Sequence, residues 1–117
     1  MGLGVEALTV HPMLSSQRET RSTAASWAAG ADVASLPTGL ALGVRQFLGR
    51  ARDLDPTTRQ AVGGRLAEQV SAYVAPAPPT GTPPYDFLAA VVATRRERDL
   101  ERLRREQATR RRLTARG

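Results

Sequence analysis

Charge and apolar residues are distributed unevenly along this chain of 117 residues, and their distribution decides which part of it can build a core. Up to Ala93, seven arginines and seven acidic residues cancel each other. After Ala93, ten arginines face four acidic residues, and the only apolar side chains larger than alanine are three leucines. The whole formal charge of +6 therefore lies in a carboxy-terminal segment that is too poor in apolar residues to join a core. The sequence predicts a small neutral body with a basic tail, and a basic surface attracts phosphate on lipid or nucleic acid.

The length of the chain allows one small domain, which is marginally stable unless its helices pack well or a partner helps. Cysteine is absent, which excludes disulfides and thiolate metal sites. The longest apolar runs, FLAAVVA and LALGV, fall far short of the roughly 20 residues that span a bilayer. The first residues also lack the basic start and continuous apolar run of a secretory signal. We therefore expect a soluble chain.

The amino-terminal residues 1–24 are rich in Ser, Thr and Gly and show neither helical nor strand periodicity, which predicts a disordered leader. The next segment, 25–31, surrounds the single tryptophan, Trp27. Two interpretations of this segment stay open. It forms a short helical turn whose indole docks on the body, or it is a linker with a partly exposed indole.

Three helices are predicted after this segment. The first follows the motif SLPTGL, in which Ser35 or Thr38 can cap the helix and Pro37 fits at or before the first turn. We expect this helix to end near residues 52–54. Its apolar positions recur at helical spacing and are Leu40, Val44, Phe47, Leu48 and Ala51.

The second helix has a stronger start signal, because Asp55 can accept N–H bonds at the amino end and Pro56 suits the first helical position. The pair Gly63-Gly64 lies in its middle and costs about 1 kcal/mol per glycine relative to alanine. Either a close helix crossing or a bias in genome composition explains the pair. The proline-rich run APAPPTGTPP ends the helix. Its apolar line consists of Val62, Leu66, Val70, Tyr73 and Val74.

The third helix begins after this run, with Thr82 as the expected cap, Pro83 as the first helical residue and Asp86 in the opening turn. Tyr85 lies at the rim of its apolar face. That face consists of Phe87, Leu88, Val91 and Val92.

From Thr94 onward the apolar face nearly disappears, yet Arg, Glu, Leu, Gln and Ala are good helix formers. Pairs four residues apart, Glu101–Arg105 and Glu106–Arg110, are expected to add about 0.2–0.5 kcal/mol each. The tail is therefore predicted to be a solvated helix that frays and projects from the body. We expect an all-α fold: a disordered leader over 1–24, a small three-helix domain over 25–93 and an arginine-rich helical tail over 94–117.

The side chains needed for catalysis are scarce, and we expect no enzymatic activity, no cofactor and no metal site. His11 is the single histidine and lies in the leader without an evident carboxylate partner. Asp55 and Asp86 lie at helix starts, where capping explains them. Arginine does not readily lose its proton and is a poor general base.

The tail supports two functional interpretations besides that of a solvated, partly self-paired helix. A basic helix can follow the phosphates of nucleic acid, although the tail has no aromatic residue for stacking and no known recognition motif. A basic helix can also lie against an anionic membrane, where it assists another anchor. All seventeen basic residues are arginine, and Lys, Ile and Asn are absent, so the composition of a G/C-rich gene accounts for part of the pattern. The residues expected to contact an anionic surface are Arg95, Arg96, Arg98, Arg102, Arg104, Arg105, Arg110, Arg111 and Arg112.

Residues 27–98 resemble the cytosolic carboxy-terminal extension of actinobacterial RDD family membrane proteins. The resemblance rests on ordered short motifs, which are the Trp27 lead-in, LPTGLAL, RQFL with RA, LDP…R, RLAEQV, PAPPTGTPP, and FLAAV running into RRER. The resemblance implies a relationship to multi-span membrane proteins of poorly defined role, for which transport of ions or small solutes is suspected. This chain departs from the family's pattern because it has no spanning helix, and Arg52-Asp53 is followed by Leu54 rather than a second Asp. Transport is therefore not carried over to any residue here.

The resemblance implies a non-catalytic accessory domain in the cytoplasm, held at the inner face of the membrane by anionic lipid or by a membrane-domain partner. The chain would then be either a detached carboxy-terminal domain or a stand-alone relative of it. The alternative is a free-standing basic protein that binds nucleic acid, which we expect less, or a regulatory protein through the same tail. In a third hypothesis Tyr85 and Phe87 are exposed and pair with a second copy.

Overall fold

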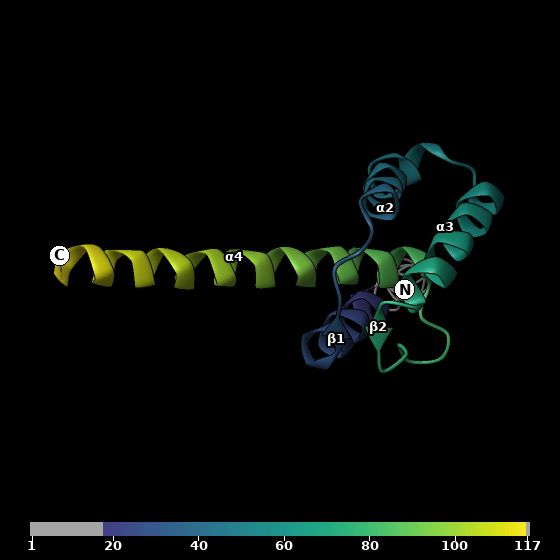
Figure 1. Ribbon diagram of the computed structural model, residues 1–117. Coiled ribbons are helices and arrows are strands. Elements are labelled where there is room, and N and C mark those ends of the chain that lie inside the picture. Colours follow the sequence, from purple (N-terminus) through teal and green to yellow (C-terminus); the bar gives the residue numbers. More distant parts are fainter. Residues whose placement is uncertain (1–17, 117) are drawn as a thin grey trace, which may run out of the picture.

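The computed structural model describes residues 18–116 and confirms the all-α class. Figure 1 shows one long helix, α4, that runs through a small body and far out of it. The helices α2 and α3 lie on one side of α4 in this view, and the amino-terminal helix lies on the other. In chain order the elements are a helix over 18–30, β1 (Asp32–Val33), α2 (Thr38–Arg50), the 3-10 turn η1 (Ala51–Asp53), α3 (Pro56–Ser71), β2 (Val74–Ala75) and α4 (Pro84–Arg116).

The 18–30 helix corrects two expectations: the disordered leader does not extend over 18–24, and within residues 18–116 the body has four α-helices rather than three. The helix buries alanines, and Ala24 and Ala28 are almost completely covered. Alanine is the best helix former, and its small side chain allows close packing without the large apolar residues that make a helical period visible. The rest of the predicted leader, including His11, lies outside the described residues.

Trp27 docks on the body, so the linker interpretation of segment 25–31 is wrong. The centroid of its indole ring lies 5.4 Å from that of Phe87 on α4. Its Nε1 donates a hydrogen bond of 3.0 Å to the carbonyl oxygen of Pro76 in the proline-rich loop. One side chain therefore connects the 18–30 helix to α4 and to the loop that precedes it.

Two short strands were not expected. Strands β1 and β2 pair antiparallel, with Asp32 opposite Ala75 and Val33 opposite Val74. The backbone N–H of Ala34 extends the pairing by donating to the carbonyl of Tyr73 at 2.8 Å. A strand of two residues is too short to produce visible alternation in a sequence, so periodicity could not reveal it.

Helix α2 begins without the side-chain cap that was expected from Ser35 or Thr38. Pro37 occupies the cap position, and no side chain there accepts a backbone N–H. Thr38 is already the first helical residue, and the hydroxyl of Ser35 accepts a hydrogen bond from Arg95 instead.

Helix α3 begins as predicted. The carboxylate of Asp55 accepts the backbone N–H of Thr58 at 3.1 Å and the Thr58 hydroxyl at 2.6 Å. These hydrogen bonds stabilise the ionised form and lower the pKa of Asp55. Pro56 occupies the first turn, as its missing N–H allows.

The close helix crossing explains one glycine of the pair in α3. A Cβ atom on Gly63 would lie 3.0 Å from Cζ of Phe47 on α2 and 3.2 Å from Cβ of Pro84 on α4. A Cβ atom on Gly64 would meet no atom within 4 Å. The crossing therefore requires Gly63 and leaves Gly64 without a packing role.

Helix α4 begins at Pro84, one residue later than predicted, and continues without a break to Arg116. The Thr82 hydroxyl is not the expected cap, because it donates to the carbonyl of Pro79 within the loop. The core lies where the first three turns of α4 meet α2, α3 and the strand pair. Its buried residues are Ala31, Val33, Val44, Phe47, Ala51, Val70, Phe87, Leu88 and Val91.

We predict that Gly63→Leu lowers the free energy of unfolding by about 1–3 kcal/mol, because the new side chain has to displace Phe47 or Pro84. Chemical denaturation followed by circular dichroism measures this change. Gly64→Leu is the matched control, and we expect it to preserve stability or to raise it by up to about 1 kcal/mol. Equal losses in the two variants would contradict the close crossing.

Candidate anionic-surface site on helix α4

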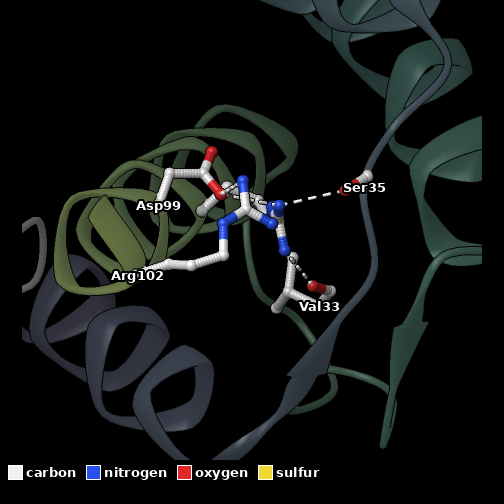
Figure 2. Close-up of polar contacts among 5 residues, drawn as sticks. Val33, Ser35, Asp99 and Arg102 are labelled. Atoms are coloured by element: carbon white, nitrogen blue, oxygen red, sulfur yellow. Dashed lines mark hydrogen bonds and ion pairs between the residues drawn. The ribbon is translucent and has the colours of Figure 1, made fainter. Parts of the chain in front are cut away.

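Arg95 connects α4 through hydrogen bonds to the segment that precedes α2. Its guanidinium donates to the carbonyl of Val33 at 3.2 Å, to the hydroxyl of Ser35 at 3.0 Å and to Asp99 at 2.8 Å (Figure 2). Val33 and Ser35 lie about sixty residues earlier in the chain. This arginine therefore joins distant segments and is not available as a free cation for a ligand.

Arg98 has a similar structural role one turn later. Its Nη2 atom lies 2.7 Å from the carbonyl oxygen of Ala31 and 3.4 Å from that of Ala28. These carbonyls lie at the carboxy-terminal end of the 18–30 helix, where the last backbone acceptors have no partner within the helix. A guanidinium is well suited to this position because it brings several donors and a positive charge to the negative end of the helix dipole.

Asp99 follows the last arginine that binds the body, and its own ion pairs lie within α4. Its carboxylate binds Arg95 at 2.8 Å and lies 3.6 Å from Nη2 of Arg102, and Figure 2 shows the Arg102 side chain reaching toward Asp99. Arg102 is largely exposed, so this second ion pair is weak in water. Three of the nine predicted contact residues are thus engaged by the protein itself.

The remaining predicted residues are exposed. Among residues 18–116, neither Glu101–Arg105 nor Glu106–Arg110 comes within the 4.0 Å of an ion pair, so the expected self-pairing of the tail is wrong for these pairs. Arg116 was not predicted and belongs to the same exposed group, which it extends to the last described turn. The members of the predicted set without an ion pair in this part of the chain are Arg96, Arg104, Arg105, Arg110, Arg111 and Arg112.

Two opposite faces of α4 follow from its 3.6 residues per turn. The body-side face continues the line of Arg98 and consists of Arg98, Arg102, Arg105, Thr109, Arg112 and Arg116. The open face lies about half a turn away and consists of Arg96, Leu100, Leu103, Arg104, Gln107 and Arg111. Both faces are basic, but only the open face carries leucines.

A shallow hollow of about 300 Å³ lies beside the open face, between α4 and the start of α2. Leu36 and Ala41 line it from the α2 side, and Val92, Leu100 and Leu103 line it from α4. Both of these α4 leucines are about half exposed, at 46% for Leu100 and 50% for Leu103. Arg45, Arg95, Arg96 and Asp99 complete its polar lining.

A larger open hollow of about 660 Å³ lies at the other end of the body, between the 18–30 helix, η1 and the start of α4. Arg59 on its wall is held by the carbonyls of Ala51 and Leu54, at 2.8 and 2.9 Å. Partial burial raises the pKa of Asp86 there, and the charge of Arg21 opposes that rise. Within the described part of the chain, no three histidine or acidic side chains cluster closely enough to bind a metal ion.

The residues named for self-association do not form an exposed patch. Phe87 is only 3% exposed and belongs to the core. The ring centroid of Tyr85 lies 6.3 Å from that of Phe47, and Tyr85 is packed against the core. Trp27 of the 18–30 helix contacts Phe87, and Phe47 of α2 contacts Tyr85, so these two rings are packed within the body.

We predict that Arg98→Ala lowers the free energy of unfolding by about 1–2 kcal/mol, because two helix-end carbonyls lose a charged donor. Thermal and chemical denaturation measure the loss. Arg105→Ala removes the same charge from the exposed part of the helix and is expected to leave Tm unchanged. A loss of similar size in both variants would mean that net charge, and not the contact, sets stability.

Comparison with protein-family models, with curated proteins and with solved structures found no match to this chain. The resemblance to the RDD family therefore stays a prediction. Across residues 18–116, none of the helices combines the length and the apolar character needed to cross a bilayer.

Proposed function

We propose that this chain is a non-catalytic accessory module that attaches to an anionic phospholipid surface through the exposed part of α4. The observation that carries the proposal is a projecting, continuous helix whose arginines within residues 100–116 are exposed and form no ion pair apart from the weak contact of Arg102. Seven arginines and two glutamates lie in this stretch, which gives it a net charge of 7 − 2 = +5. At a rise of 1.5 Å per residue it extends about 25 Å.

The expected attachment is reversible and depends on salt. An arginine close to anionic lipid gains about 1 kcal/mol, and the gain falls off over a Debye length of about 8 Å at physiological salt. Only the arginines on the side that faces the lipid can therefore contribute fully. Binding of this size assists another anchor and does not replace one.

An accessory domain of an RDD-type membrane protein fits this requirement, because the membrane domain would supply the anchor. The resemblance to that family's cytosolic extension covers the body and the start of the tail. The lipid surface in question would be the inner leaflet, whose anionic lipids attract basic segments on the cytoplasmic side.

Nucleic acid is the alternative ligand, and one observation favours it. The exposed arginines point to several sides of the helix, including four on the body-side face, Arg102, Arg105, Arg112 and Arg116. Arginines on several sides of a helix suit a ligand that surrounds the helix. A nucleic-acid groove is such a ligand, because phosphates line both of its walls.

We predict that the chain floats with phosphatidylglycerol vesicles at low salt, does not float with phosphatidylcholine vesicles, and is released as salt rises. Changing Arg110, Arg111 and Arg112 to Gln should weaken binding about 10- to 100-fold. The matched control changes three exposed body arginines, Arg50, Arg52 and Arg65, to Gln and should have a much smaller effect. A chain that ignores anionic vesicles at low salt would refute the proposal.

Electrophoretic mobility shift across a salt series tests the alternative. If the chain shifts a DNA or RNA duplex at salt concentrations that release it from vesicles, nucleic acid is the preferred ligand. We expect the reverse order, with release from nucleic acid at the lower salt concentration.

A further inference from the structure

The two basic faces of α4 are not equally accessible to a flat surface. On the body-side face, Phe87 packs on Trp27 and Arg98 binds the end of the 18–30 helix. Figure 1 shows that helix projecting from α4 on this side. A plane that approaches the body-side face meets the 18–30 helix before it reaches Arg105 or Arg112.

The side of α4 about half a turn from Arg98 is exposed from Ala93 onward, whereas Tyr85 and Val92, nearer the start of the helix, pack against the core. Ala93, Arg96 and Glu97 are exposed although they lie within the turns that pack on the body. A flat surface can therefore reach α4 on this side from the last turn of the body outward. This exposed side includes Arg96 and the rest of the open face, and Glu97 lies at its border.

The composition of the open face suits the boundary between lipid headgroups and acyl chains. Leu100 and Leu103 are half exposed, and Arg96, Arg104 and Arg111 flank them. The acidic residues of the projecting part, Glu101 and Glu106, lie on other sides of the helix. Leucines with flanking arginines bind at this boundary, because the apolar groups enter it while the guanidinium groups reach phosphate.

We propose that the open face is the part of α4 that contacts the bilayer, with α4 lying along the surface of an anionic phospholipid membrane. The inference rests on the membrane function proposed above and specifies its contact residues. The partner is lipid and not a second copy of this chain, because two open faces would bring arginines of like charge together around only two leucines per copy.

Two triple variants with equal charge test this orientation on the full chain. The open-face triple changes Arg96, Arg104 and Arg111 to Gln, and the body-side triple changes Arg105, Arg112 and Arg116 to Gln. All six side chains are exposed, so neither triple is expected to alter folding, which circular dichroism checks. Binding to phosphatidylglycerol vesicles should fall about 100-fold for the open-face triple and less than tenfold for the body-side triple.

The outcomes separate the orientation from the proposed function. Equal losses in the two triples, together with binding by the unchanged chain, would overturn the open face and leave the membrane function standing. A larger loss in the body-side triple would also overturn it. Absence of binding by the unchanged chain would refute the membrane function itself.

A second measurement does not depend on charge. The chain contains no cysteine, so one introduced cysteine labels one site. Gln107→Cys places an environment-sensitive fluorophore on the open face, and Thr109→Cys places it on the body-side face at nearly the same distance along the helix. With vesicles that carry a quencher on their acyl chains, we expect quenching at position 107 to be at least threefold stronger than at position 109. Equal quenching, or stronger quenching at position 109, would contradict the orientation.

Discussion

Two guanidinium groups, those of Arg95 and Arg98, determine how the long helix joins the body. Both donate hydrogen bonds to carbonyl or hydroxyl oxygens of the segment 31–35, which connects the 18–30 helix to α2. The apolar core ends at Val91, one turn before Arg95, and the buried Thr94 directly precedes Arg95. A helix held only by Phe87, Leu88 and Val91 would have its last core contact at Val91, whereas the two arginines extend the contact with the body to Arg98 and fix the rotation of α4 about its axis. Because the helix is continuous, that rotation also decides where every later side chain points.

The arginines of this segment consequently divide into two groups that composition does not distinguish. Arg95 and Arg98 use the several donors of a guanidinium to bridge two or three acceptors, which the single ammonium of a lysine could not match in geometry. Arg104 and Arg111 are exposed and form no ion pair within residues 18–116. A bias toward arginine in a G/C-rich gene is therefore compatible with specific roles at particular positions.

The sequence was sufficient for the parts of the fold that depend on large apolar residues. Val44 and Phe47 identified α2, the Asp55-Pro56 pair identified the start of α3, and Phe87, Leu88 and Val91 identified α4. The 18–30 helix was missed because its buried residues are alanines, which leave no strong period. The expected cap at Ser35 was wrong because its hydroxyl binds Arg95, sixty positions away, and no local pattern reports so distant a partner. For the site, the charge pattern predicted the exposed arginines other than Arg116, but it did not reveal the structural roles of Arg95 and Arg98 or the two faces.

The continuity of α4 with its core-held first turns explains why the highly charged segment that follows them can remain helical. An isolated helix of about 17 residues is marginal in water, because its first turn must be formed at a large cost in conformational entropy. Here the core and the two arginines already hold the turns from Pro84 to Asp99 in helical conformation. The exposed part therefore extends an existing helix and does not bear the cost of nucleation. Propagation adds one backbone hydrogen bond per residue, and good helix formers such as Arg, Glu and Leu favour it. The body thus gives the basic segment a fixed direction and a fixed rotation, and the open face with Leu100 and Leu103 follows from both.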